Sequence, residues 1–82
     1  MRPNELINLI RRQPFQPLRI HVSDGTTYDI LHPDQIIVLR GRLDIGVGAD
    51  PETGAMERTE FVSLLHVVRV EELAFTSPRG SA

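Results

Sequence analysis

Apolar residues alternate with polar ones over positions 18–22 and again over positions 27–30. Such period-two alternation is typical of a strand that buries one face. Asp24 and Gly25 stand between the two stretches, and glycine tolerates the positive φ that a tight turn requires. The pattern therefore predicts an antiparallel hairpin whose strands are joined by a two-residue Asp-Gly turn.

Before the hairpin, apolar residues recur at helical spacing, at Leu6, Ile7, Leu9 and Ile10. This spacing predicts a helix over residues 3–13. Pro3 suits its first turn, and Pro14 ends it. Because a helix of this length is unstable alone, we expect its apolar stripe to lie on the sheet.

Further stretches predict strands after the hairpin. The continuous apolar run over residues 36–39 is consistent with a strand buried on both faces, and residues 43–47 alternate. Residues 59–62 begin another strand, and residues 67–70 form the last one. Ser63 is placed to cap a brief turn between these last two strands.

The order of these elements predicts a mainly β (α+β) fold in a single domain over residues 1–75, followed by a disordered tail over residues 76–82. An N-terminal helix precedes about five short antiparallel strands. Short strands and tight turns favour a small, partly open barrel of the SH3/Sm-like kind. A two-layer arrangement with the helix on one face of the sheet is the alternative.

The chain has 82 residues, of which 40% are hydrophobic, so it supports one small core. Small domains of this kind often gain stability by oligomerisation, and we expect a homo-oligomer. The lack of cysteine excludes a disulfide framework and fits a cytoplasmic protein. No signal peptide and no apolar run of roughly 20 residues is visible, so we expect no membrane partner.

All nine basic residues are arginine, and the formal net charge of −2 gives no bulk attraction to nucleic acid. Several arginines could still form a local patch for phosphates: Arg11, Arg12, Arg19, Arg40 and Arg42. We prefer the alternative, in which the arginines pair with carboxylates such as Asp29, Asp44, Glu60 and Glu71. Aromatic residues for base stacking are scarce, because Phe15 and Phe61 are assigned to the core.

The candidate metal ligands are His21, His32, His66 and Asp34. Their spacing matches no recognised metal motif, and we expect neither a metal nor another cofactor. Residues 32–34 instead predict a structural turn, in which Pro33 presets φ and Asp34 accepts backbone N–H bonds. No orienting acid or oxyanion site can be placed beside Ser63 and His66, so we assign no catalytic residue.

Segments 13–20, 23–25 with 27–29, 32–34 and 63–71 together resemble a family of short bacterial proteins. Members carry a PF-P-R-I, S-D-G, H-P-D and L-L-H-I-V pattern and are numerous in planctomycete-type genomes. The pattern is specific as a set and covers most of the chain. The resemblance implies no particular chemistry.

The order of helix, bent strands and a short turn before the last strand also resembles Sm-like proteins. That resemblance implies rings formed by pairing of edge strands, with RNA bound by loops. The RNA-binding motifs of those proteins do not carry over. Residues 32–35 lack the expected asparagine, and the Arg40-Gly41 pair stands too early in the chain.

The sequence therefore favours a non-catalytic interaction or assembly module that self-associates through sheet edges and also offers a surface to a protein partner. We expect the last strand, residues 67–70, to be the exposed edge, because it has no proline and only Arg69 as an interior charge. The candidate interaction residues are Arg19, His21, His32, Asp34, Arg40 and Arg42. An Sm-like RNA-binding protein is the alternative function, and a small metal-dependent enzyme is the third.

Overall fold

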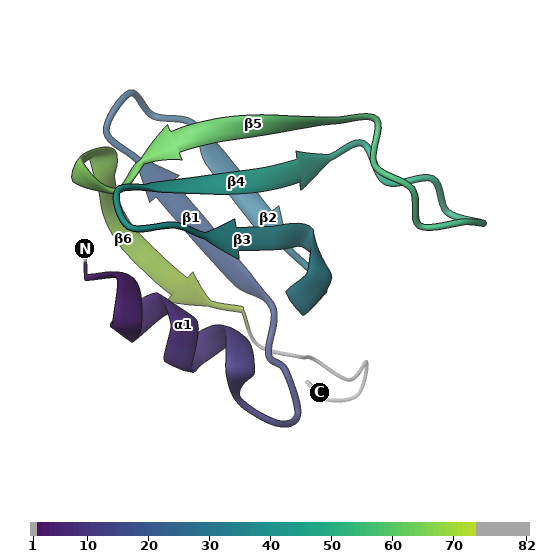
Figure 1. Cartoon of the computed structure of the whole chain (residues 1–82), viewed down its shortest axis with the longest axis horizontal. Coiled ribbons are helices and arrows are strands. Elements are labelled where there is room, and N and C mark those ends of the chain that lie inside the picture. Colours follow the sequence, from purple (N-terminus) through teal and green to yellow (C-terminus); the bar gives the residue numbers. More distant parts are fainter. Residues whose placement is uncertain (1, 74–82) are drawn as a thin grey trace, which may run out of the picture.

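The computed structural model describes residues 2–73, which form one helix and six strands (Figure 1). These elements are α1 (Pro3–Arg11), β1 (Leu18–Val22), β2 (Thr27–Ile30), β3 (Ile36–Val38), β4 (Arg42–Val47), β5 (Arg58–Ser63) and β6 (Val67–Glu72). Two 3₁₀ turns, η1 (Pro33–Gln35) and η2 (Leu64–His66), precede β3 and β6. The tail predicted over residues 76–82, and the domain end predicted at residue 75, lie outside the described residues.

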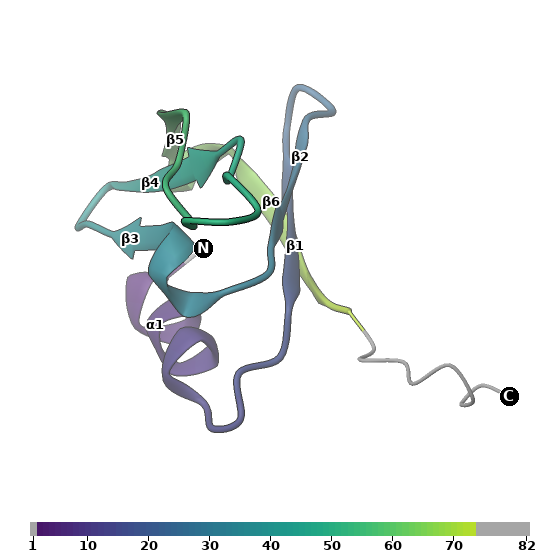
Figure 2. The ribbon, with the colours of Figure 1, turned by 90° about the vertical axis from the view of Figure 1, so that its right-hand side faces the viewer.

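The strands form two antiparallel three-stranded sheets, with the orders β2–β1–β6 and β3–β4–β5. Figure 2 shows the sheets as two facing layers, with α1 below the β3–β4–β5 sheet. The predicted mainly β fold with an N-terminal helix is confirmed. The partly open barrel is not, because the strands of residues 2–73 divide into two sheets. Pro33, which cannot donate to a ladder, lies where the chain passes from one sheet to the other.

The hairpin predicted around Asp24 and Gly25 is confirmed, with β1 and β2 paired from Leu18↔Ile30 to His21↔Thr27. Its connection is longer than predicted. Val22 N–H donates to Thr26 C=O at 2.9 Å, which leaves a three-residue loop over residues 23–25. Gly25 ends this loop at φ 93°, a left-handed conformation that glycine adopts without steric cost.

Helix α1 ends at Arg11, two residues before the predicted end at residue 13. Its apolar stripe packs as expected. Leu6 is fully buried, and Leu9 and Ile10 pack against the core. The helix lies beside β3 and covers the end of the space between the two sheets (Figures 1 and 2).

The core lies between the two sheets and α1. Its buried side chains are Leu6, Leu18, Ile20, Ile30, Ile36, Leu43, Ile45, Val62, Leu64 and Val67. Phe15, in the connection from α1 to β1, packs against this cluster and joins the helix to the sheets, as predicted.

Two predictions of burial are wrong. In the run 36–39, Ile36 is buried, but Ile37 is 59% exposed and Leu39 is 39% exposed. The core covers only one face of the β3–β4–β5 sheet, so every second residue of β3 points to solvent. Phe61 is 62% exposed for the same reason, because Val62 takes the inward position on β5.

Candidate interaction surface

Arg19 lies on the outer face of β1 and is held by a carboxylate on the neighbouring strand. It donates from Nε to Asp29 Oδ1 at 2.7 Å and from Nη2 to Asp29 Oδ2 at 3.1 Å. These hydrogen bonds lower the pKa of Asp29, because they favour its charged form. The ion pair is bidentate and joins neighbouring strands, so it links β1 to β2 on the solvent side.

His21 lies on the same face, beside Glu71 and Arg69 of β6. Its Nε2 is 3.0 Å from Glu71 Oε1, and Arg69 Nη2 is 3.2 Å from the same oxygen. The hydrogen bond from His21, and then that from Arg69, lower the pKa of Glu71. The structure thus brings Arg19 and His21 onto one polar face of the β2–β1–β6 sheet, in two neighbouring cross-strand rows.

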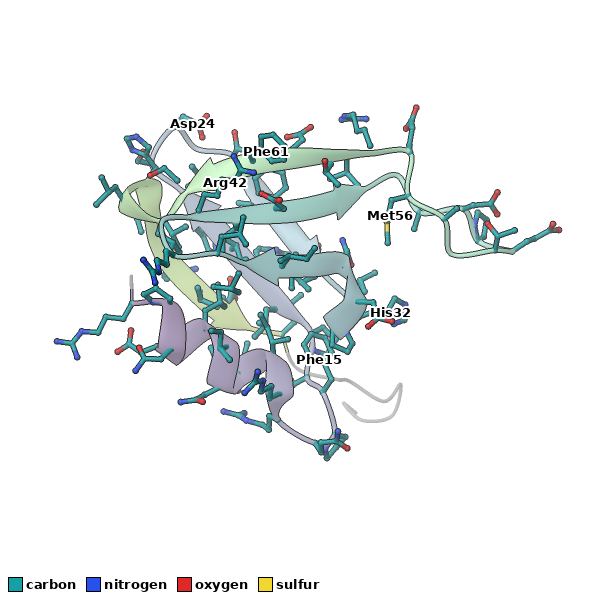
Figure 3. The ribbon with its side chains drawn as sticks, viewed as in Figure 1. Phe15, Asp24, His32, Arg42, Met56 and Phe61 are labelled. Atoms are coloured by element: carbon teal, nitrogen blue, oxygen red, sulfur yellow. The ribbon has the colours of Figure 1, made fainter. Side chains whose placement is uncertain are left out.

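Arg40 and Arg42 flank the β3–β4 turn, on the other sheet. The Arg42 guanidinium lies over the Phe61 ring, 4.2 Å from its centroid (Figure 3). Its Nε is 3.0 Å from Asp44 Oδ1, which is close enough for an ion pair. That buried oxygen nevertheless has no aligned hydrogen-bond donor within residues 2–73. We therefore regard the contact as an electrostatic pair and not as a hydrogen bond.

The preferred explanation of the arginines, pairing with carboxylates, is confirmed for Arg19 with Asp29 and for Arg42 with Asp44. Arg12 also pairs with a carboxylate, with its Nη1 3.1 Å from Glu72 Oε1. Exposed pairs of this kind contribute about 0–1 kcal/mol each. They also occupy guanidinium groups that a phosphate would otherwise meet.

His32 and Asp34 lie at η1, on the connection between the two sheets, where both are exposed (Figure 3). The predicted turn is confirmed, but Asp34 is not the residue that bonds the backbone there. Gln35 accepts from Leu31 N–H at 2.9 Å and donates to Asp29 C=O at 3.0 Å and to Gly46 C=O at 3.1 Å. This side-chain amide therefore links β2 to β4 across the gap between the sheets, a role that the sequence did not indicate.

A cleft of about 330 Å³ opens between the β1–β2 hairpin and the end of β5. It is lined by Val22, Ser23, Asp24, Thr26, Tyr28, Phe61, Val62, Ser63 and His66. Ser63 caps η2 as predicted, because its Oγ accepts from Leu65 N–H at 3.2 Å. His66 Nδ1 instead contacts Ser23 Oγ, at 3.2 Å. Ser63 and His66 thus have separate partners, and this geometry does not make them a nucleophile and its base.

Tyr28 closes the inner side of the cleft by donating from its hydroxyl to Glu60 Oε1 at 2.6 Å. The hydrogen bond to Glu60, followed by burial, raises the pKa of Tyr28 to about 12. The same hydrogen bond lowers the pKa of Glu60. Tyr28 therefore joins β2 to β5 through a short, charge-assisted contact.

β5 and β6 are edge strands, and η2 joins them. Within residues 2–73, each pairs on one side only, β5 with β4 and β6 with β1. The segment exposes three large apolar side chains, Phe61 at 62%, Leu65 at 89% and Val68 at 64%. We call these two edges and the turn between them the β5–β6 corner. The expectation that the last strand is an edge is confirmed, and β5 is a second edge that the sequence did not single out.

No family model, curated protein or solved structure matches this chain. In residues 2–73, no group of three or more histidine or carboxylate side chains could hold a metal ion. Within the same residues, the helix is too short and too polar to cross a bilayer. The site must therefore be interpreted from its own geometry.

Proposed function

We propose that this protein is a non-catalytic interaction module that self-associates through its exposed sheet edges. The single observation that carries the proposal is the β5–β6 corner, where η2 joins two strands that each have one unpaired edge, and where three large apolar side chains are exposed. Unpaired N–H and C=O groups on a strand edge accept another strand readily. The three exposed side chains lie within residues 61–68, and exposed apolar side chains favour an interface where they form one patch.

Mass measured by light scattering over a range of protein concentrations tests the proposal. We expect the average mass to rise from that of one chain as the concentration increases. A double variant, Phe61→Ser with Val68→Ser, should reduce this rise because it removes an apolar side chain from each edge. Weak dimers form at concentrations on the order of millimolar. A mass that stays that of one chain up to this concentration contradicts the proposal.

Leu31→Ser with Ile37→Ser is the matched control. Both side chains are exposed to a similar extent, 53% and 59%. Leu31 directly follows β2 and Ile37 lies in β3, so neither belongs to β5 or β6. The control should associate like the native protein. Equal losses in the two double variants would assign the association to general hydrophobicity and not to the corner.

RNA binding by an Sm-like architecture is the weaker alternative. The net charge is −2, and Arg12, Arg19 and Arg42 are each paired with a carboxylate. Binding of RNA through these arginines must first break those pairs and must depend steeply on salt. No observation on the described surface favours that function over self-association.

A further inference from the structure

We propose that two copies of the chain pair antiparallel along β5, around a two-fold axis at Phe61. The proposal rests on the proposed function and names the edge, the partner and the register. The two β3–β4–β5 sheets then continue as one sheet of six strands. Both copies use the same strand in this interface, so each copy has no further β5 edge to offer and the assembly stops at a dimer.

The hydrogen-bond pattern of β4 decides which groups of β5 are free. Leu39 N–H donates to Arg42 C=O at 2.9 Å across the β3–β4 turn, so Arg42 and every second residue after it bond to β3. Leu64 N–H donates to Gly41 C=O at 3.0 Å, which places the intervening residues of β4 in hydrogen bonds with β5.

On β5, the residues opposite those β4 positions are Arg58, Glu60 and Val62. Thr59 and Phe61 therefore direct their N–H and C=O groups away from β4, towards the free edge. Ser63 directs only its N–H there, because the C=O of this N-cap residue accepts the first hydrogen bond of η2. In Figure 1, β5 is the upper edge strand of the β3–β4–β5 sheet, and the loop of the β1–β2 hairpin rises behind its end. The cleft beside Phe61 separates this end of β5 from the β1–β2 hairpin.

The register follows from these outward groups. With Phe61 opposite Phe61 of the second copy, Thr59 lies opposite Ser63 of that copy. The two Phe61 residues then exchange two hydrogen bonds, and the N–H of each Ser63 reaches the C=O of Thr59 in the other copy. A shift that instead puts Glu60 opposite Glu60 of the second copy leaves Ser63 beyond the end of β5 in that copy. It also sets like charges face to face, which is unfavourable on paired strands.

The side chains on the outer face of the β3–β4–β5 sheet also support a two-fold axis at Phe61. Ile37, Asp44 and Phe61 lie in one row across β3, β4 and β5. The two-fold axis extends this row through a pair of phenylalanine rings into the same row of the second copy. Directly opposed aromatic residues stabilise antiparallel strands. The exposed ring of Phe61 thus gains an apolar partner, while Arg42 covers it from the side of β4.

Proline substitution tests which edge is used. Thr59→Pro removes an N–H that points to the free edge, so it breaks no bond to β4 and blocks a strand from pairing there. Thr27→Pro is the matched control. Val22 N–H bonds Thr26 C=O, so Thr27 on β2 also points its N–H away from its neighbour. We expect Thr59→Pro to weaken self-association by at least roughly tenfold and Thr27→Pro to leave it unchanged.

Single cysteines test the register, because the native chain has none. Opposed hydrogen-bonded residues have Cα atoms about 5.5 Å apart, which suits a disulfide. Under mild oxidation, we expect Phe61→Cys to form covalent dimers. Thr59→Cys on the same strand and Arg69→Cys on β6 should not, because neither lies near its own copy. Circular dichroism on each variant confirms that it is folded.

The outcomes separate the two proposals. If the native protein associates, Thr59→Pro weakens it and Phe61→Cys crosslinks, the inference is supported. If the native protein associates but Thr59→Pro behaves like Thr27→Pro, or Arg69→Cys crosslinks in place of Phe61→Cys, the inference is overturned and the proposed function stands. If the native protein is a monomer throughout, both proposals are overturned.

Discussion

The two free edges at the β5–β6 corner are protected to different extents. β6 contains a bulge between the pairs His21↔Arg69 and Val22↔Val67, and its Glu72 is tied to Arg12. β5 keeps an unbroken register with β4 over six pairs. Bulges and charged side chains are means by which proteins make an edge unattractive to another strand.

The contrast also changes which edge we expect a second strand to use. Residues 67–70 contain no proline and only Arg69 as an interior charge, which indicated an unprotected strand. The protection of β6 comes from its bulge and from Arg12, and neither can be read from that segment. β5 carries Arg58 and Glu60, but these charges pair with each other at 3.0 Å and leave Phe61 exposed.

The largest effects should come from the central strands, which support both edges equally. Ile45 on β4 and Ile20 on β1 are both fully buried. We expect Ile45→Ala and Ile20→Ala each to lower the free energy of unfolding by about 2–5 kcal/mol. Urea denaturation measures both. A loss in either variant below about 1 kcal/mol would mean that one sheet is not supported by this core.

The next effect should come from removing the charges on the outer face of β6, which add to the protection by its bulge and by Arg12. Arg69→Val with Glu71→Val takes two charges from the outer face of that strand and frees His21 of its partners. We expect self-association to begin at a protein concentration lower by roughly tenfold. Asp34→Val with Arg40→Val also removes one charge of each sign, but at turns outside the two edges. Equal behaviour of the two double variants would show that these charges do not guard β6.

A smaller effect concerns the hydrogen bond from Tyr28 to Glu60, which joins β2 to β5. The protein has one tyrosine and no tryptophan, so phenolate absorbance reports on Tyr28 alone. We expect a midpoint at about pH 12, and a return towards the ordinary value of 10.0 in Glu60→Gln. The pKa is raised in the folded state. The contribution of Tyr28 to stability is therefore complete below the unfolded pKa and is lost as pH rises through the folded pKa. A native midpoint near 10 would mean that the contact between β2 and β5 is absent in solution.

Local chemistry made part of this structure predictable. Gly25 with its positive φ, Pro14 after the helix and the Ser63 cap all act within a few residues. The alternating strands 18–22 and 43–47 were predicted for the same reason, since period-two burial is a local pattern.

The remainder depends on contacts between distant segments. Whether the run 36–39 is covered on one face or two depends on which sheet and helix lie beside it, and the run itself carries no sign of this. Gln35 reaches Gly46, and His66 reaches Ser23. Phe61 was assigned to the core because aromatic residues usually are buried. On β5, however, Val62 points inward, so its neighbour Phe61 points to solvent.

Amide hydrogen exchange, followed residue by residue as the protein concentration rises, tests the central claim most directly. Phe61 on β5 points its N–H to a free edge, and so does Val70 on β6, because Leu73 N–H bonds Pro17 C=O at 2.9 Å. We expect exchange at Phe61 to slow by at least roughly tenfold at high concentration while exchange at Val70 stays fast. Slowing at Val70 without slowing at Phe61, or no change at either amide, would contradict pairing along β5.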